Sequence, residues 1–103
     1  MIRHLVHLRF RKDVSESEKQ ALYDDLSGLS GHIDGIVDFQ SRKNVSVETP
    51  VVRDFLDMFW FDFRDVSVRD RYLEDETHQE IGGRIVERLD GGIDGVFVCD
   101  IEL

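Results

Sequence analysis

Residues 55–63 read Phe-Leu-Asp-Met-Phe-Trp-Phe-Asp-Phe, the strongest strand signal in the chain. Aromatic and branched apolar residues favour pleated structure, and here they occur on both sides of the alternation. A strand that is apolar on both faces belongs in the middle of a sheet whose faces are both covered. The stretch therefore predicts a central strand with other structure packed above and below it.

The segment before this strand predicts a strand, a helix and a second strand. Residues 2–10 alternate with period two, and their more apolar face carries His4, Val6, Leu8 and Phe10. Ser15 and Glu18 form a capping box that begins a helix, which the glycines at residues 28–31 end. A more polar strand is predicted over Ile36–Val47.

The segment after the central strand predicts a helical region in two parts and a last strand. Helical spacing resumes from about Ser67, and a second apolar stripe marks another helix that ends at Asp90-Gly91-Gly92. This stripe consists of Ile81, Ile85, Val86 and Leu89. Val96–Glu102 is predicted as the final strand.

This order of elements predicts an α+β fold in one domain over residues 1–103. The β-α-β-β-α-β sequence is that of the ferredoxin-like arrangement, an antiparallel sheet with helices on one face only. The other face would carry Leu5, Leu56, Met58 and Trp60, which are too apolar to face water. A second copy that packs sheet against sheet covers this face most simply, so we expect a homodimer.

Composition excludes several classes of partner. The net charge of -9 disfavours binding to nucleic acid and to anionic membrane surfaces. The single cysteine, Cys99, lies in an apolar run and is interpreted as a small buried hydrophobe. Neither a signal peptide nor an apolar span of membrane length is recognisable, so the cytoplasm is the expected compartment.

The order and spacing of several residues resemble those of the stress-responsive dimeric α/β-barrel (Dabb) family. They are the histidine-bearing first strand, the turn at Gly35-Ile36, the late spacing of Phe63, Tyr72 and His78, and Asp100 in the last strand. The resemblance covers nearly the whole chain. It implies a homodimer whose two sheets close a barrel.

The same resemblance implies candidate roles for four residues. A plant polyketide cyclase of this family closes a tetraketide by an intramolecular aldol step without a cofactor. Its acid–base pair, a tyrosine and a histidine, aligns with Tyr72 and His78, and two further residues align with His4 and Asp100. Asp57 stands where the cyclase has a mid-strand histidine.

The residues themselves allow Tyr72 and His78 to meet only if the helix breaks between them. Six residues of continuous helix turn through about 600°, which leaves the two side chains roughly 240° apart around the axis. Thr77 and Glu80 fit a second capping box, with Thr77 as N-cap and His78 as the first helical residue. The positive end of the helix dipole would keep the His78 imidazole neutral, as a general base requires.

The strand alternation predicts a cavity between sheet and helices for a small apolar or aromatic ligand. Its floor would be Val6, Leu8, Phe59 and Val98, and its polar end would hold His4, Asp57, Tyr72, His78 and Asp100. Gly82, inside the last helix, would lie beside it, where either close helix–sheet packing or the approach of a ligand explains a glycine. No motif for a metal or a cofactor is present.

Two alternatives stay open at this point. Inward tyrosine and histidine side chains near a helix break also serve only to satisfy backbone groups, and His4 would then form a structural pair with Asp100 or Asp57. The other alternative is a cofactor-independent enzyme, cyclase-like or monooxygenase-like. In it His78 removes a proton next to a ketone while Tyr72 donates to the carbonyl oxygen.

Overall fold

The predicted central strand is β3, Asp57–Phe63, in the computed structural model, which describes all of residues 1–103. It pairs with β1, Ile2–Leu8, on one side and with β2, Ile36–Lys43, on the other. β4, Val96–Glu102, pairs with the free side of β1. The sheet is antiparallel with strand order β2-β3-β1-β4, which confirms the ferredoxin-like α+β arrangement.

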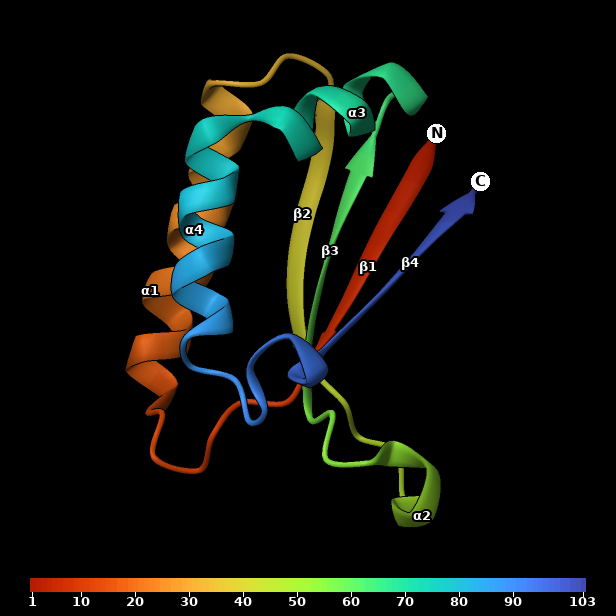
Figure 1. The fold of residues 1–103 in the computed structure, drawn as a ribbon. Coiled ribbons are helices and arrows are strands. Elements are labelled where there is room, and N and C mark those ends of the chain that lie inside the picture. Colours follow the sequence, from red (N-terminus) through yellow and green to blue (C-terminus); the bar gives the residue numbers. More distant parts are fainter.

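The two long helices cover one face of the sheet, as Figure 1 shows. They are α1, Glu16–Ser27, and α4, Glu76–Val86. α3, Val66–Glu74, precedes α4, and the short α2, Thr49–Val52, lies in the β2–β3 connection at the opposite end of the sheet. Single 3₁₀ turns occupy residues 28–31 and 92–95. No helix has the length and apolarity that crossing a membrane requires.

The core lies between the helices and this face of the sheet. Strand residues alternate as predicted, so Val6, Leu8, Phe59 and Phe61 point toward the helices and are buried. α1 and α4 contribute Leu22, Leu26, Ile81 and Ile85 to the same cluster. The helices cover β1 and β3 on this face, so the side chains of these two strands are held by core packing, whereas Val98 of β4 remains 48% exposed.

Element boundaries differ from the predicted ones at four places. β1 ends at Leu8 rather than at residue 10, and β3 begins at Asp57 rather than at residue 55. β2 ends at Lys43 rather than Val47, because the Asn44 side chain donates to the Phe55 carbonyl at 3.0 Å and accepts from the Ser46 amide at 3.0 Å, which turns the chain. The last helix ends at Val86, before the predicted stop near Asp90. The capping box at Ser15 and Glu18 is confirmed, with hydrogen bonds of 3.1 and 3.2 Å.

Gly35 fixes how closely α3 approaches the sheet. Its φ is 99°, and a Cβ at this position would collide with a methyl group of Val68 in α3. Only glycine tolerates both the conformation and the contact. The position of α3, and so of Tyr72 on it, depends on this turn.

The other face of the sheet is not covered by any element of the chain. Leu5, Met58 and Trp60 lie on it half-buried, and Phe97 and Ile101 of β4 are exposed. Leu56, predicted on this face, precedes β3 and is 52% exposed. We refer to the apolar band of Leu5, Met58, Trp60, Phe97 and Ile101 as the open-face band.

Candidate functional site

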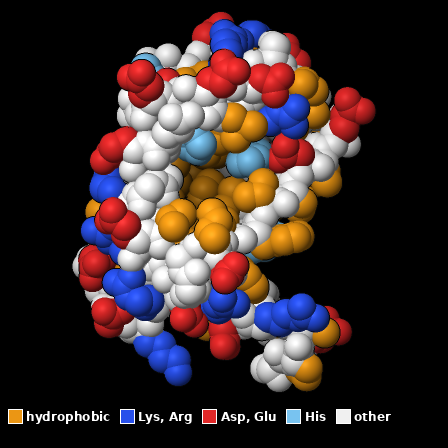
Figure 2. All heavy atoms as spheres, viewed as in Figure 1, with side chains coloured by type: hydrophobic (Ala, Val, Ile, Leu, Met, Phe, Trp, Pro, Cys, Tyr) orange, Lys and Arg blue, Asp and Glu red, His pale blue; other side chains and the backbone are white.

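A cavity of about 280 Å³ lies between the helices and the β1–β4 side of the sheet. Figure 2 shows a hollow with apolar atoms inside it and histidine side chains along its upper rim. Its floor is Val6, Leu8, Phe59 and Val98, the four residues predicted for it, with Val96 beside them. α1 and α4 add Leu26, Gly82, Ile85 and Val86.

Tyr72 and His78 meet at the polar end of the cavity. α3 and α4 are separate helices, so the predicted break exists, and the ring centroids of the two residues are 3.8 Å apart. The prediction of Thr77 as N-cap is wrong. Asp75 caps α4, and its Oδ2 accepts from the His78 amide at 2.9 Å. Aspartate is the stronger N-cap, and α4 therefore begins at Glu76, which places His78 at its third position.

Asp75 also contacts His32, which lies in the loop before β2. His32 Nε2 lies 2.6 Å from Asp75 Oδ1, and the Asp75 side chain is only 14% exposed. Burial alone would raise the pKa of Asp75, but the His78 amide and the His32 ring lower it. The N-cap that positions His78 is therefore a carboxylate at neutral pH.

His4 faces Tyr72 from the first strand and is held by Asp100. His4 Nδ1 lies 2.6 Å from Asp100 Oδ1, and because a carboxylate only accepts, Nδ1 carries the proton. Arg69 Nη1 donates to the other oxygen of Asp100 at 2.8 Å. Burial would raise the pKa of Asp100, but the hydrogen bonds from His4 and Arg69 outweigh it and lower that pKa.

Two polar atoms at this end of the cavity have no hydrogen-bond partner in the chain. They are the Tyr72 hydroxyl and Nδ1 of His78, and both are buried. Burial and the Asp100 carboxylate raise the pKa of Tyr72, so the phenol keeps its proton. Burial and the neighbouring His4 lower the pKa of His78, and the Tyr72 backbone and the Asp75 carboxylate oppose this only in part. The pair thus presents a protonated phenol and a neutral imidazole.

Asp57 does not belong to this site, contrary to its predicted place. β1 and β3 are antiparallel, so Asp57 pairs with Leu8 and lies at the opposite end of the sheet from His4. Its carboxylate accepts from Lys19 at 3.0 Å and Lys43 at 2.7 Å, and both lysines also contact Glu16. The four residues join α1 to β2 and β3. The buried hydroxyl of Tyr23 lies beside them without a partner.

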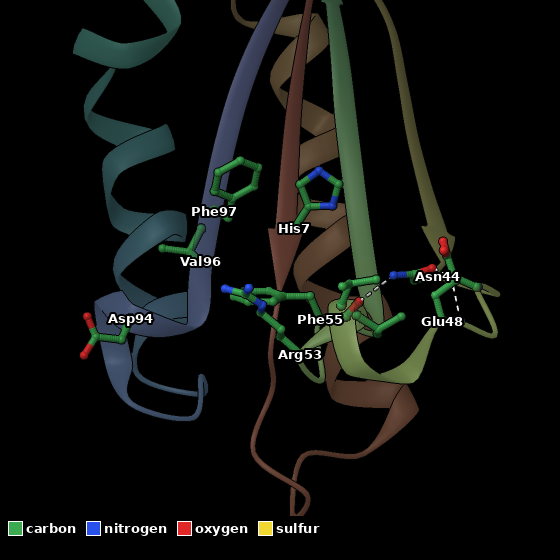
Figure 3. A pocket seen from close by; sticks show the side chains of 11 residues that line it. His7, Asn44, Glu48, Arg53, Phe55, Asp94, Val96 and Phe97 are labelled. Atoms are coloured by element: carbon green, nitrogen blue, oxygen red, sulfur yellow. Dashed lines mark hydrogen bonds between the residues drawn. The ribbon is translucent and has the colours of Figure 1, made fainter.

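A larger hollow of about 590 Å³ lies near the α2 end of the molecule. Figure 3 shows His7 and Phe97 side by side on neighbouring strands at one end of it, with ring centroids 5.5 Å apart. Both side chains belong to the open face of the sheet. None of its lining residues carries a buried polar atom without a partner. The larger hollow therefore lacks the buried, unpartnered polar atoms that the smaller cavity has at its polar end.

The sequence alone did not identify several residues of the site. Leu73, Ile85 and Val86 line the cavity, and the helical spacing of Gly82, Ile85 and Val86 could have placed them on one face. Arg69 had no such signal. Its bond to Asp100 joins residues 31 positions apart and depends on how α3 packs against β4.

Comparison with known proteins extends these observations. The chain is similar to a crystal structure of a dimeric ferredoxin-like protein of unknown function from Jannaschia sp. CCS1, with 27% identity, a TM-score of 0.88 and coverage of 99% of this chain and 98% of that one. A protein from Arabidopsis thaliana gives 21% identity, a TM-score of 0.87 and coverage of 100% and 95%. None of the curated proteins compared with the sequence matches it.

An enzyme is also among the similar structures. The hydroxynitrile lyase from Passiflora edulis shares 12% identity at a TM-score of 0.78, with coverage of 99% and 92%, which establishes a common fold. At the level of sequence, the family model of the stress responsive A/B barrel domain matches residues 2–103. The chain therefore belongs to the stress responsive A/B barrel domain (Dabb) family.

Proposed function

We propose that this protein binds a small, neutral, largely apolar molecule in the cavity between the helices and the sheet. The observation that carries the proposal is the pair of unpartnered atoms, Tyr72 Oη and His78 Nδ1, at the polar end of a cavity whose floor and helix side are apolar. A buried polar atom without a partner costs about 1–3 kcal/mol. A ligand oxygen that accepts from Tyr72 would remove part of that cost.

The lining of the cavity favours a neutral ligand over an anion. No lysine or arginine lines it, and its one charged side chain is the Asp100 carboxylate. The chain as a whole carries a net charge of -9. The lining therefore offers no cation to a carboxylate or a phosphate, whereas a phenol or an aryl ketone offers an apolar ring for the floor and an oxygen for Tyr72.

Tyr72→Phe tests this proposal, because we expect it to move stability and binding in opposite directions. Removal of a buried hydroxyl that has no partner should raise the free energy of unfolding by about 1 kcal/mol. The same change should weaken binding of a phenol such as 2-naphthol roughly tenfold, through the loss of one hydrogen bond. Urea unfolding and fluorescence titration measure the two quantities. A destabilised variant that binds as the wild type does would contradict a ligand-facing role for the hydroxyl.

The functional unit of the proposal is a homodimer. The open-face band is an apolar surface on a chain of only 103 residues, and a second copy would bury it. The similar Jannaschia protein is described as dimeric, which supports the same assembly here. Burial also lowers the pKa of His7 on this face, so its ring is neutral at pH 7 and compatible with an apolar interface.

A second candidate function is acid–base catalysis without a cofactor, cyclase-like or monooxygenase-like, at the same site. The neutral His78 ring would take a proton from the carbon next to a carbonyl, and Tyr72 would donate to the carbonyl oxygen as negative charge develops there. The Passiflora lyase supports this candidate only in that an enzyme uses the same fold. Deuterium exchange at the methyl group of acetophenone in D₂O would detect the proton transfer. Catalysis requires that exchange is faster with the wild type and lost in both Tyr72→Phe and His78→Ala.

Either function requires His78 to be neutral near pH 7, and its titration checks this. The pKa of His78 is lowered in the folded state, so the unfolded chain binds more protons in the acidic range. We therefore expect an NMR titration midpoint for the His78 ring below about 6.5. Stability should fall as pH drops below the unfolded-state pKa, and this fall should be smaller in His78→Gln. A midpoint at or above the ordinary histidine value would contradict the neutral imidazole.

A further inference from the structure

Gly82 occupies a position where neither the backbone nor the packing requires a glycine. It lies within α4, and it is absent from the glycines with positive φ. A Cβ at this position would meet no heavy atom within 4 Å. Glycine nevertheless destabilises a helix interior relative to alanine. The expected alternative of close helix–sheet packing at Gly82 is therefore wrong.

The space that the missing side chain leaves belongs to the cavity. Gly82 is one of the lining residues, together with Ile85 and Val86 on the same helix. It follows His78 by four positions, so the two residues lie one helical turn apart on the same face of α4. A ligand whose oxygen reaches Tyr72 and His78 would place its apolar body beside the α4 backbone at Gly82.

We propose that Gly82 sets the size of the ligand by leaving room for a body larger than a single ring against α4. The proposal rests on the proposed binding function and adds the specificity-determining residue and the ligand class, a neutral bicyclic or alkyl-substituted aromatic with one phenol or ketone oxygen. A side chain at residue 82 would fill the place of the second ring. A single-ring ligand would keep its contacts with Tyr72, His78 and the valines of the floor.

Gly83 provides a matched control in the same helix. It is exposed, it does not line the cavity, and a Cβ there also meets nothing within 4 Å. Substitutions at residues 82 and 83 therefore change helix propensity equally but differ in whether they fill the cavity. Alanine at either position should raise the melting temperature by roughly 4–8 °C.

The test compares binding of 2-naphthol and of phenol to wild type, Gly82→Ala, Gly82→Leu and Gly83→Leu by fluorescence titration and calorimetry. We expect the dissociation constant of 2-naphthol to rise about threefold in Gly82→Ala and at least ~30-fold in Gly82→Leu. For phenol the rise should stay below about fivefold in both variants, because one ring leaves residue 82 free. Gly83→Leu should bind both probes as the wild type does.

Three results would overturn the proposal. The first is that Gly82→Leu binds 2-naphthol as tightly as the wild type does. The second is an equal loss in Gly83→Leu, which would assign the effect to helix flexibility. The third is that the wild type binds neither probe, in which case the proposed function itself fails. If Gly82→Leu does not fold, Gly82→Ala provides the test. A roughly threefold weaker binding of 2-naphthol with unchanged binding of phenol would support the proposal, and unchanged binding of both would overturn it.

Discussion

Asp57→Ala is expected to lower the free energy of unfolding by about 3 kcal/mol, because it removes one partner of a buried ion pair. The Asp57 side chain is 4% exposed and Lys19 is 12% exposed, so little water is available to replace the lost contact. Of its two carboxylate partners, Lys19 would keep only Glu16, at 3.1 Å. Urea unfolding at a fixed protein concentration measures the effect.

The control for this prediction lies in the same cluster. Glu16 contacts the same two lysines but is 71% exposed, so Glu16→Ala should change stability by less than about 1 kcal/mol. Asp57→Ala should also leave binding of 2-naphthol in the folded protein unchanged, since Asp57 lies outside the cavity. If the folded Asp57→Ala variant did not bind 2-naphthol, Asp57 would belong to the ligand site after all.

Trp60→Asp is expected to convert the proposed homodimer into a monomer. Trp60 lies in the middle of the open face, between the guanidinium groups of Arg3 and Arg42, whose centres are 5.4 and 5.6 Å from its ring. Even when Arg42 pairs with it, a carboxylate there must be desolvated against the other sheet, and the interface also loses the apolar area of the indole. Light scattering should give twice the chain mass of 12.0 kDa for the wild type and the chain mass for the variant.

Val66→Asp separates a specific effect from the mere addition of charge. Val66 is 44% exposed at the first position of α3, outside the open-face band, where an acid suits the helix terminus. This variant should remain a dimer. A wild type that is monomeric at micromolar concentration, or a dimer that tolerates Trp60→Asp, would show that the open face is not the interface.

Local patterns were sufficient to predict most of the fold. The alternation of residues 2–10 and the aromatic run at 55–63 gave the two central strands, because one apolar face must be buried and this fixes which side chains point inward. The capping box at Ser15 was predicted for the same reason, since its two hydrogen bonds lie within four residues. The short helix at residues 49–52 was missed because four residues carry no periodicity.

The candidate site was predicted only where its geometry follows from local structure. A helix break is needed between Tyr72 and His78 because six residues of continuous helix would turn their side chains away from each other. The cavity floor follows from strand alternation. The placement of Asp57 in the site was wrong because its position depends on how β1 pairs with β3. Asp57 and His4 each lie near the start of their strands, and antiparallel pairing puts two such positions at opposite ends of the sheet. The predicted antiparallel sheet therefore already implied that Asp57 and His4 are far apart. The choice of Asp100 as the partner of His4 depends on the β1–β4 register.

An apolar ligand with one oxygen should bind between the helices and the sheet, and its position there can be measured. Intermolecular NOEs between 2-naphthol and the methyl groups of the labelled protein locate the bound ligand. Binding in the cavity should give NOEs to Val6, Val98 and Ile85, which line it. NOEs confined to Val51 and Val52, which line the larger hollow, or the absence of any NOE at saturating probe, would contradict it.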